Sequence, residues 1–152
     1  MSGKAVLKSN CSILFCELQK AVDNYLKHGH IRGEVQYIDA FLTATIHSFI
    51  DYADGHLDPN KQDDEFNACR YANNVLKHKS ALVTHEKVIG GFHFPLRLST
   101  SPIIFPKIQV VWNYDKTLTI QSKNQQSAFE TLFAGKPIID TLLPLANKID
   151  NS

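Results

Sequence analysis

Apolar side chains recur every three or four residues from Ser12 to Lys79, and this spacing constrains the fold more than any other feature of the chain. Such spacing places the apolar residues on one face of a helix. Gly29 separates the first amphipathic segment from the second, because glycine readily ends a helix. Gly55 and the turn-forming stretch Asp58-Pro59-Asn60 separate the second segment from the third. The sequence therefore predicts three consecutive helices in this stretch.

The ends of these helices can be placed from their capping residues. Ser12 is the predicted N-cap of the first helix, which leaves residues 1–10 as a polar, frayed end. The second helix is predicted to begin at Gly33, and the third at Asp63 or Asp64. The second helix carries more apolar residues than one packed face needs, so we expect some of them to be left for a partner. These residues include Ile38, Phe41, Ile46 and Phe49.

Short β-prone runs replace the helical spacing after Lys79. The runs are Leu82-Val83, Val88-Ile89, Phe92-His93-Phe94, Ile103-Ile104-Phe105 and Ile108 to Trp112. Asn113-Tyr114-Asp115-Lys116 predicts a hairpin turn that leads into a last strand from Thr117 to Gln121. Aromatic residues of the strands are expected to pack the hairpin onto the helices.

Helical spacing returns in the tail. It predicts one helix from Gln125 to Phe133 that stops at Gly135, and a last helix with Pro137 in its first turn. Pro144 is expected to kink or interrupt that last helix, because proline lacks the backbone N–H that a helix interior needs.

Together these elements predict a mainly α fold in a single domain over residues 1–152. The expected architecture is a bundle of about four helices with a small antiparallel β insertion between helices three and four. Its parts are a helical region 12–79, the insertion 80–122 and a helical tail 125–150.

Composition narrows the class of protein. Of the 152 residues, 43% are hydrophobic and 20% are charged. These proportions suit one domain with a packed core. The formal net charge of +1 gives no overall field to attract duplex DNA or an anionic membrane. The three cysteines have no C-x-x-C spacing, which is typical of reduced thiols. No apolar run is long enough for a signal peptide or a membrane span, so we predict a cytoplasmic protein.

A polar stripe on the third helix is the strongest functional indication. Arg70, Asn74 and His78 follow one another at four-residue intervals, so they share one face of the helix. A histidine can transfer protons near neutral pH, and a guanidinium can stabilise the charge of a phosphorane. This combination would support RNA cleavage without a metal.

The segment from Asn73 to His78 resembles the motif of the HEPN superfamily of small helical bundles, in which Arg, a polar residue and His lie on one helix. The resemblance implies a homodimer, an RNA or protein partner, and a setting in phage defence or a toxin–antitoxin system. Asn73 stands where the ribonuclease members carry Arg, which favours a non-catalytic or regulatory binding module. The alternative is a metal-independent ribonuclease that uses His78 and Arg70, with Asn74 beside them, so the residues leave open whether the chain is an enzyme.

Histidines and carboxylates near the end of the second helix suggest a third function. His47 and Asp51 lie four residues apart and share a helix face. With His28 or His30 they could form a site of two histidines and one carboxylate in a metal-binding bundle. However, the seven histidines do not follow the ligand spacing of zinc or iron sites, so we predict neither a tightly held metal nor a cofactor.

Overall fold

The computed structural model describes residues 2–28, 34–79, 84–89, 107–118 and 122–152. These segments form five α-helices and one two-stranded sheet, which confirms the predicted mainly helical fold with a small β insertion. In chain order the elements are α1 (Gly3–Lys27), α2 (Glu34–His56), α3 (Asp64–Lys79), β1 (Thr84–Ile89), β2 (Lys107–Trp112), α4 (Lys123–Leu132) and α5 (Ile138–Asp150).

Helix α1 begins well before the predicted position. Its N-cap is Ser2, whose side-chain oxygen accepts a hydrogen bond from the backbone N–H of Ala5 at 3.3 Å. Lys4, Ala5, Leu7 and Lys8 are good helix formers, and Leu7 packs against the hydrophobic core. The prediction of a frayed end before Ser12 was therefore wrong, because a cap and one apolar anchor suffice to extend the helix.

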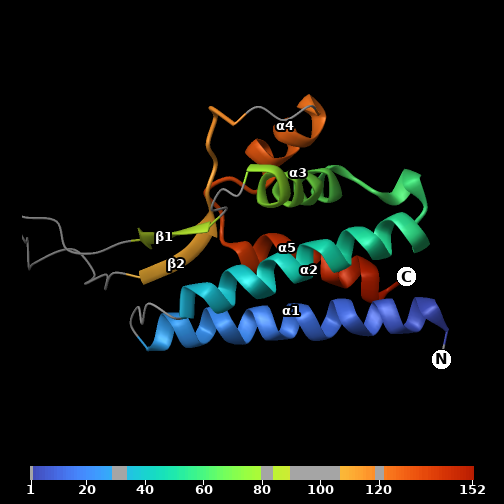
Figure 1. The fold of residues 1–152 in the computed structure, drawn as a ribbon, viewed down its shortest axis with the longest axis horizontal. Helices are drawn as coiled ribbons and strands as arrows, with labels where there is room; N and C mark the ends of the chain where they lie inside the picture. Colours follow the sequence, from blue (N-terminus) through green and yellow to red (C-terminus); the bar gives the residue numbers. More distant parts are fainter. Residues whose placement is uncertain (1, 29–33, 80–83, 90–106, 119–121) are drawn as a thin grey trace, which may run out of the picture.

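Helices α1 and α2 form an antiparallel pair at one edge of the molecule (Figure 1). Helix α5 contacts both of them, while α3 packs on α2 and carries α4 on its other side. Ile38, Ile46 and Phe49 of α2 are buried in the core between these helices, and Phe41 is half-buried at its edge. These four residues of the predicted surplus are thus used inside the chain, except for part of Phe41.

The two strands form an antiparallel ladder that runs from Thr84 opposite Trp112 to Ile89 opposite Lys107. The predicted strands at Val88-Ile89 and Ile108 to Trp112 are confirmed, whereas those at 82–83, 92–94 and 103–105 lie outside the described residues. Trp112 is fully buried against Phe129 and Phe133, as expected for an aromatic residue that packs a hairpin onto helices. Its indole N–H donates a 2.6 Å hydrogen bond to Thr141 of α5.

The predicted last strand does not form at Thr117 and Leu118. The Asp115 carboxylate accepts hydrogen bonds from the backbone N–H and the hydroxyl of Thr117, at 2.9 and 2.6 Å. The N–H of Leu118 then donates to the Asp115 carbonyl at 3.2 Å. This local turn uses the groups that a strand would offer to a neighbour. Residues 119–121 of the predicted strand lie outside the described residues.

The tail is divided at Gly135, which has a positive φ of 73° that favours glycine. Pro137 is the N-cap of α5, and Pro144 lies inside α5 without ending it. The predicted interruption at Pro144 was therefore wrong. Leu142, Leu145 and Ile149 on the buried face of α5 hold the helix against the core on both sides of the proline.

None of the helices in the described segments combines the length and hydropathy needed to cross a bilayer.

Candidate functional site

Arg70, the predicted electrostatic partner of His78, is engaged within the fold. One nitrogen of its guanidinium, Nη2, donates to Asp54 Oδ1 at 2.5 Å and to Gln62 Oε1 at 2.6 Å. Its side chain is 20% exposed. Both acceptors precede α3 in the chain, so Arg70 fastens α3 to the end of α2 and to the loop between them.

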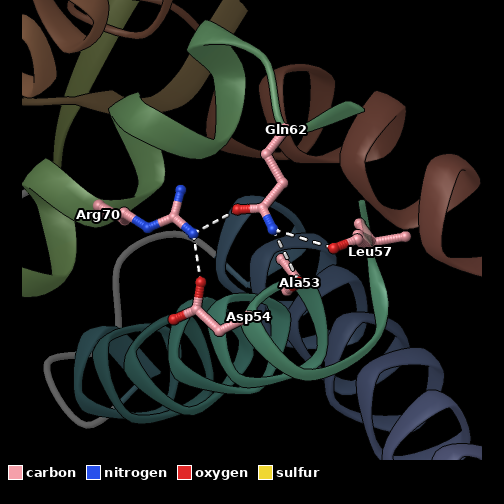
Figure 2. A network of polar contacts seen from close by, with 5 residues as sticks. All are labelled: Ala53, Asp54, Leu57, Gln62 and Arg70. Atoms are coloured by element: carbon pink, nitrogen blue, oxygen red, sulfur yellow. Dashed lines mark hydrogen bonds and ion pairs between the residues drawn. The ribbon is translucent and has the colours of Figure 1, made fainter. Parts of the chain in front are cut away.

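Gln62 completes this junction from the loop side (Figure 2). Its amide Nε2 donates to the carbonyl oxygens of Ala53 at 2.8 Å and Leu57 at 3.4 Å. The Ala53 carbonyl also accepts the backbone N–H of Leu57 at 3.1 Å, so Gln62 adds a second donor there and supplies one to Leu57, just beyond the end of α2. The loop itself contains a short 3-10 turn over Pro59–Lys61, where a turn was predicted. No spacing in the sequence indicates the role of Gln62, because its partners lie on two different helices.

Asn74 of the predicted stripe and the neighbouring Asn73 are also engaged within the fold, whereas His78 is not. The Asn74 amide donates to Gln125 Oε1 of α4 at 3.1 Å, which links the two helices. Asn73, at the motif's Arg position, is a buried polar residue of α3. His78 is exposed in the last turn of α3 and makes no hydrogen bond or ion pair with another described residue.

The geometry of α3 does not assemble a phosphate site from these residues. Arg70 and His78 are separated by eight residues of the chain. This separation corresponds to a rise of about 12 Å along the helix. The Arg70 side chain is directed toward Asp54 on α2 and Gln62 in the loop (Figure 2). A single phosphate therefore cannot contact both side chains unless the Arg70 junction opens.

The alternative metal site lacks a third ligand in the described part of the chain. His47 Nε2 lies 3.3 Å from Asp51 Oδ2, and both side chains are about half exposed. Cys11 Sγ of α1 lies 3.1 Å from Ser48 Oγ of α2. His47 precedes Ser48, so it lies close to the position of Cys11 along the axis of α1. His28 is seventeen residues further along the chain than Cys11. Along a helix this separation is about 25 Å. His30 lies outside the described residues, and no group of three metal-ligating side chains occurs within them.

The three cysteine thiols differ in burial. Burial raises the pKa of the Cys69 thiol to about 12, against the lowering effect of the neighbouring Arg70 charge. Burial also raises the pKa of Cys11, although its hydrogen bond to Ser48 opposes this shift. Cys16 is the exposed thiol of the three. The two buried thiols are therefore poor nucleophiles near neutral pH.

Two grooves lie along the join of α1 and α2. One has a volume of about 280 Å³ and is lined by Glu17, Lys20, Ala21, Asn24, Tyr37 and Phe41. The other, of about 420 Å³, is lined on α1 by Leu7, Asn10, Ile13 and Leu14, and on α2 by Ala44, His47, Ser48 and Asp51. All these residues belong to α1 and α2, and we call the two grooves together the α1–α2 seam.

The seam combines exposed apolar side chains with balanced charges. Tyr37 is 63% exposed and Ile13 is 57% exposed. Such exposure is notable for large apolar side chains that line a groove. Glu17 and Lys20 form an ion pair at 3.1 Å in one groove, and His47 lies beside Asp51 in the other. Each groove thus contains one basic and one acidic side chain.

A third hollow, of about 630 Å³, lies where the ends of α1, α2 and α5 meet. It is lined by Lys4, His56, Leu57, Asp58, Asn147, Lys148, Asn151 and Ser152. Lys148 is engaged there by the carboxylates of Asp63 and Glu65, so its charge ties α5 to the start of α3. The positive charge of this hollow is therefore partly neutralised, although two lysines line it.

Comparison of the chain with protein-family models, curated proteins and solved structures gave no significant match.

Proposed function

We propose that this protein is a non-catalytic, HEPN-like binding module that acts through the α1–α2 seam. The observation that carries the proposal is the engagement of Arg70 by Asp54 and Gln62. A catalytic guanidinium has to be available to the substrate, whereas this one closes a junction between two helices. Arg70 and Asn74 of the polar stripe are better explained as part of the fold than as catalytic machinery.

The α1–α2 seam supports the binding half of the proposal. Large apolar side chains exposed beside grooves are typical of surfaces that receive a helix from a partner. Ile13 and Tyr37 provide such side chains at separate points along the seam. Polar side chains such as Asn10, Asn24 and Ser48 also line the grooves, so the surface can stay in water until the partner binds.

The charges of the seam favour a protein partner over RNA. Nucleic-acid surfaces concentrate Lys and Arg, because phosphate contacts dominate the affinity. Here Lys20 is paired with Glu17, and His47 is paired with Asp51. The likeness of the α3 motif to the HEPN superfamily favours a regulatory setting for such a module, in phage defence or a toxin–antitoxin system.

The test combines RNA cleavage and RNA binding. Wild-type protein and His78→Ala are incubated with a mixed-sequence single-stranded RNA in the presence of a chelator. We expect no cleavage above background in either sample, and no change in the fluorescence anisotropy of a labelled RNA at physiological salt. Metal-independent cleavage by the wild type that falls about 10²–10⁴-fold in His78→Ala would instead establish a ribonuclease. Salt-sensitive RNA binding would show that nucleic acid is the partner.

A further inference from the structure

The hydroxyl of Tyr71 on α3 belongs to a buried side chain and makes no hydrogen bond with another described residue. Tyr71 is 2% exposed, and its ring packs against Phe129 and Tyr114, with centroids 4.8 and 6.3 Å away. Nearly all buried polar groups in folded proteins have a partner, because burial removes their hydrogen bonds to water. The Tyr71 hydroxyl is therefore able to donate to, or accept from, a group that the fold does not supply.

Two carboxylates lie close to this hydroxyl. Asp115 follows Tyr114 in the turn after β2, and Glu130 lies on α4. The Tyr114 hydroxyl donates to Glu130 Oε2 at 3.3 Å and accepts from the Gln126 amide at 3.2 Å. Burial raises the pKa of Tyr71, and its charge interactions with Tyr114, Asp115 and Glu130 raise it further. The Tyr71 oxygen therefore lies within electrostatic reach of both carboxylates. We call these five residues the Tyr71 cluster.

The carboxylates of the cluster have no counterion in the described part of the chain. Asp115 and Glu130 are exposed, and neither forms an ion pair there, although Lys116 follows Asp115. Both hydrogen bonds from Thr117 go to Asp115 Oδ1, so Oδ2 is left to accept others. Glu130 Oε1 is likewise left to accept, because Tyr114 donates to Oε2. Two negative charges beside a partnerless hydroxyl are suited to a cation that carries N–H donors.

The shape of the cluster favours a guanidinium over other cations. A metal ion is disfavoured, because no group of three metal-ligating side chains occurs in the described segments. A guanidinium has five N–H donors in one plane, so it can donate to several acceptors at once. Its flat face can also lie against an aromatic ring, and the half-buried Tyr114 offers one beside the carboxylates. An ammonium is more strongly hydrated and therefore loses more when it is partly buried.

We propose that the Tyr71 cluster binds a guanidinium group, which donates to the carboxylates of Asp115 and Glu130 and to the Tyr71 hydroxyl. An arginine side chain of another protein and a free alkylguanidine both carry this group, and they differ in the peptide atoms that surround it. The cluster shares no residue with the α1–α2 seam, so this site goes beyond the proposed function.

A titration followed by NMR tests the site. The ¹⁵N-labelled protein is titrated with N-acetylarginine methylamide, with butylguanidinium, and with N-acetylcitrulline methylamide, which replaces the guanidinium by a neutral urea of similar shape. The first two should shift amide signals in residues 70–74, 113–117 and 125–131, and the citrulline compound should not. Tighter binding of the arginine compound than of butylguanidinium assigns the site to a protein's arginine. Equal binding of the two assigns it to a small guanidine.

Loss of one charge should weaken this binding. Glu130→Gln removes the carboxylate charge and keeps an oxygen that can accept from Tyr114. Its dissociation constant for the arginine compound should rise about tenfold, because charge-assisted hydrogen bonds are stronger than neutral ones. Asp23→Asn is the matched control, since Asp23 is also an exposed acid but lies on α1. It should leave the dissociation constant unchanged.

Removal of the hydroxyl separates binding from folding. Tyr71→Phe should raise the dissociation constant about threefold, because one hydrogen bond to the ligand is lost. Its Tm without ligand should stay the same or rise, since the hydroxyl has no hydrogen bond within the described fold to lose. Tyr37→Phe removes the hydroxyl of an exposed tyrosine of α2 and should change neither quantity.

Three results would overturn the site. The first is the absence of shifts with both guanidinium compounds at millimolar concentration, or equal shifts with the citrulline compound. The second is undiminished binding by Glu130→Gln. The third is a lower Tm of Tyr71→Phe, which would mean that the hydroxyl serves the fold rather than a ligand.

Discussion

Helix α2 takes part in two contacts that use polar side chains in opposite ways. At its junction with α3, Asp54 and the carbonyl of Ala53 are joined to Arg70 and Gln62, so donors and acceptors from three segments satisfy one another. Along the α1–α2 seam, the ion pair Glu17–Lys20 stays on one helix and leaves the groove accessible. The comparison shows that a polar stripe becomes structural when another segment supplies its partners. Spacing along one helix cannot reveal this.

The largest expected effect is the difference in stability loss between removing an aromatic side chain from the core and removing one from the seam. Phe129 is fully buried against Tyr71 and Trp112. Phe129→Ala should therefore lower the free energy of unfolding by about 3–5 kcal/mol. Tyr37→Ala on the seam should change it by no more than about 0.5 kcal/mol at low protein concentration. Urea unfolding of both variants measures the difference, and similar losses would mean that Tyr37 is part of the fold.

The junction itself should depend more on its amide than on its ion pair. Gln62→Ala removes a donor that the carbonyls of Ala53 and Leu57 share, and an acceptor of Arg70. This variant should lose about 1–3 kcal/mol of stability. The Asp54 side chain is 59% exposed, so water screens its charge. Asp54→Ala should therefore lose less than about 1 kcal/mol.

The same urea unfolding measurement compares the two junction variants. Added salt should reduce the contribution of Asp54 and leave that of Gln62 unchanged, because salt screens charge pairs more than neutral hydrogen bonds. A larger loss of stability in Asp54→Ala than in Gln62→Ala would show that the ion pair contributes more to the junction than the amide.

The helices were largely predictable because burial dictates their spacing, and the buried set on α2 and α3 follows that spacing closely. The start of α1 was missed because residues 3–10 bury little and depend on a cap at Ser2. The predicted strand at Thr117 failed because the Asp115 side chain forms a turn that competes with pairing. In the candidate site, the spacing of Arg70 and Asn74 on one helix was right, but both had partners that only the tertiary fold could supply.

A smaller effect is expected where β1 meets α2. Burial raises the pKa of the Asp39 carboxyl above its ordinary value of 3.8, although the Thr84 hydroxyl, which donates to it at 3.3 Å, opposes the shift. A raised pKa means that the folded state disfavours the charged form. The carboxylate therefore destabilises the fold above its pKa, and the effect disappears as the pH falls below 3.8.

Asp39→Asn keeps an oxygen acceptor for Thr84 and removes the charge. The variant should therefore have a slightly higher Tm than the wild type at pH 7, and the difference should vanish in acid. Thermal unfolding followed by circular dichroism over a pH series provides the measurement. A variant that is less stable at pH 7 would indicate that the charge itself supports the contact.

The smallest perturbation is chemical labelling, which requires no change in the sequence. In the native state a thiol reagent should label Cys16 rapidly, whereas Cys11 and Cys69 should react only after unfolding. Mass spectrometry of the labelled peptides identifies the sites. Rapid native labelling of Cys11 would mean that α1 and α2 separate readily, which would weaken the description of the seam as a preformed surface.

Amide hydrogen exchange at low and high protein concentration tests both sides of the comparison in one measurement. If the seam holds the homodimer that the resemblance to the HEPN superfamily implies while α3 serves the fold, raising the concentration should slow exchange in residues 6–24 and 37–51. Exchange in the α3 residues 64–79 should stay the same. Slower exchange confined to α3 would contradict the assignment of the α1–α2 seam as the binding surface, and no slowing anywhere would contradict a second copy as its partner.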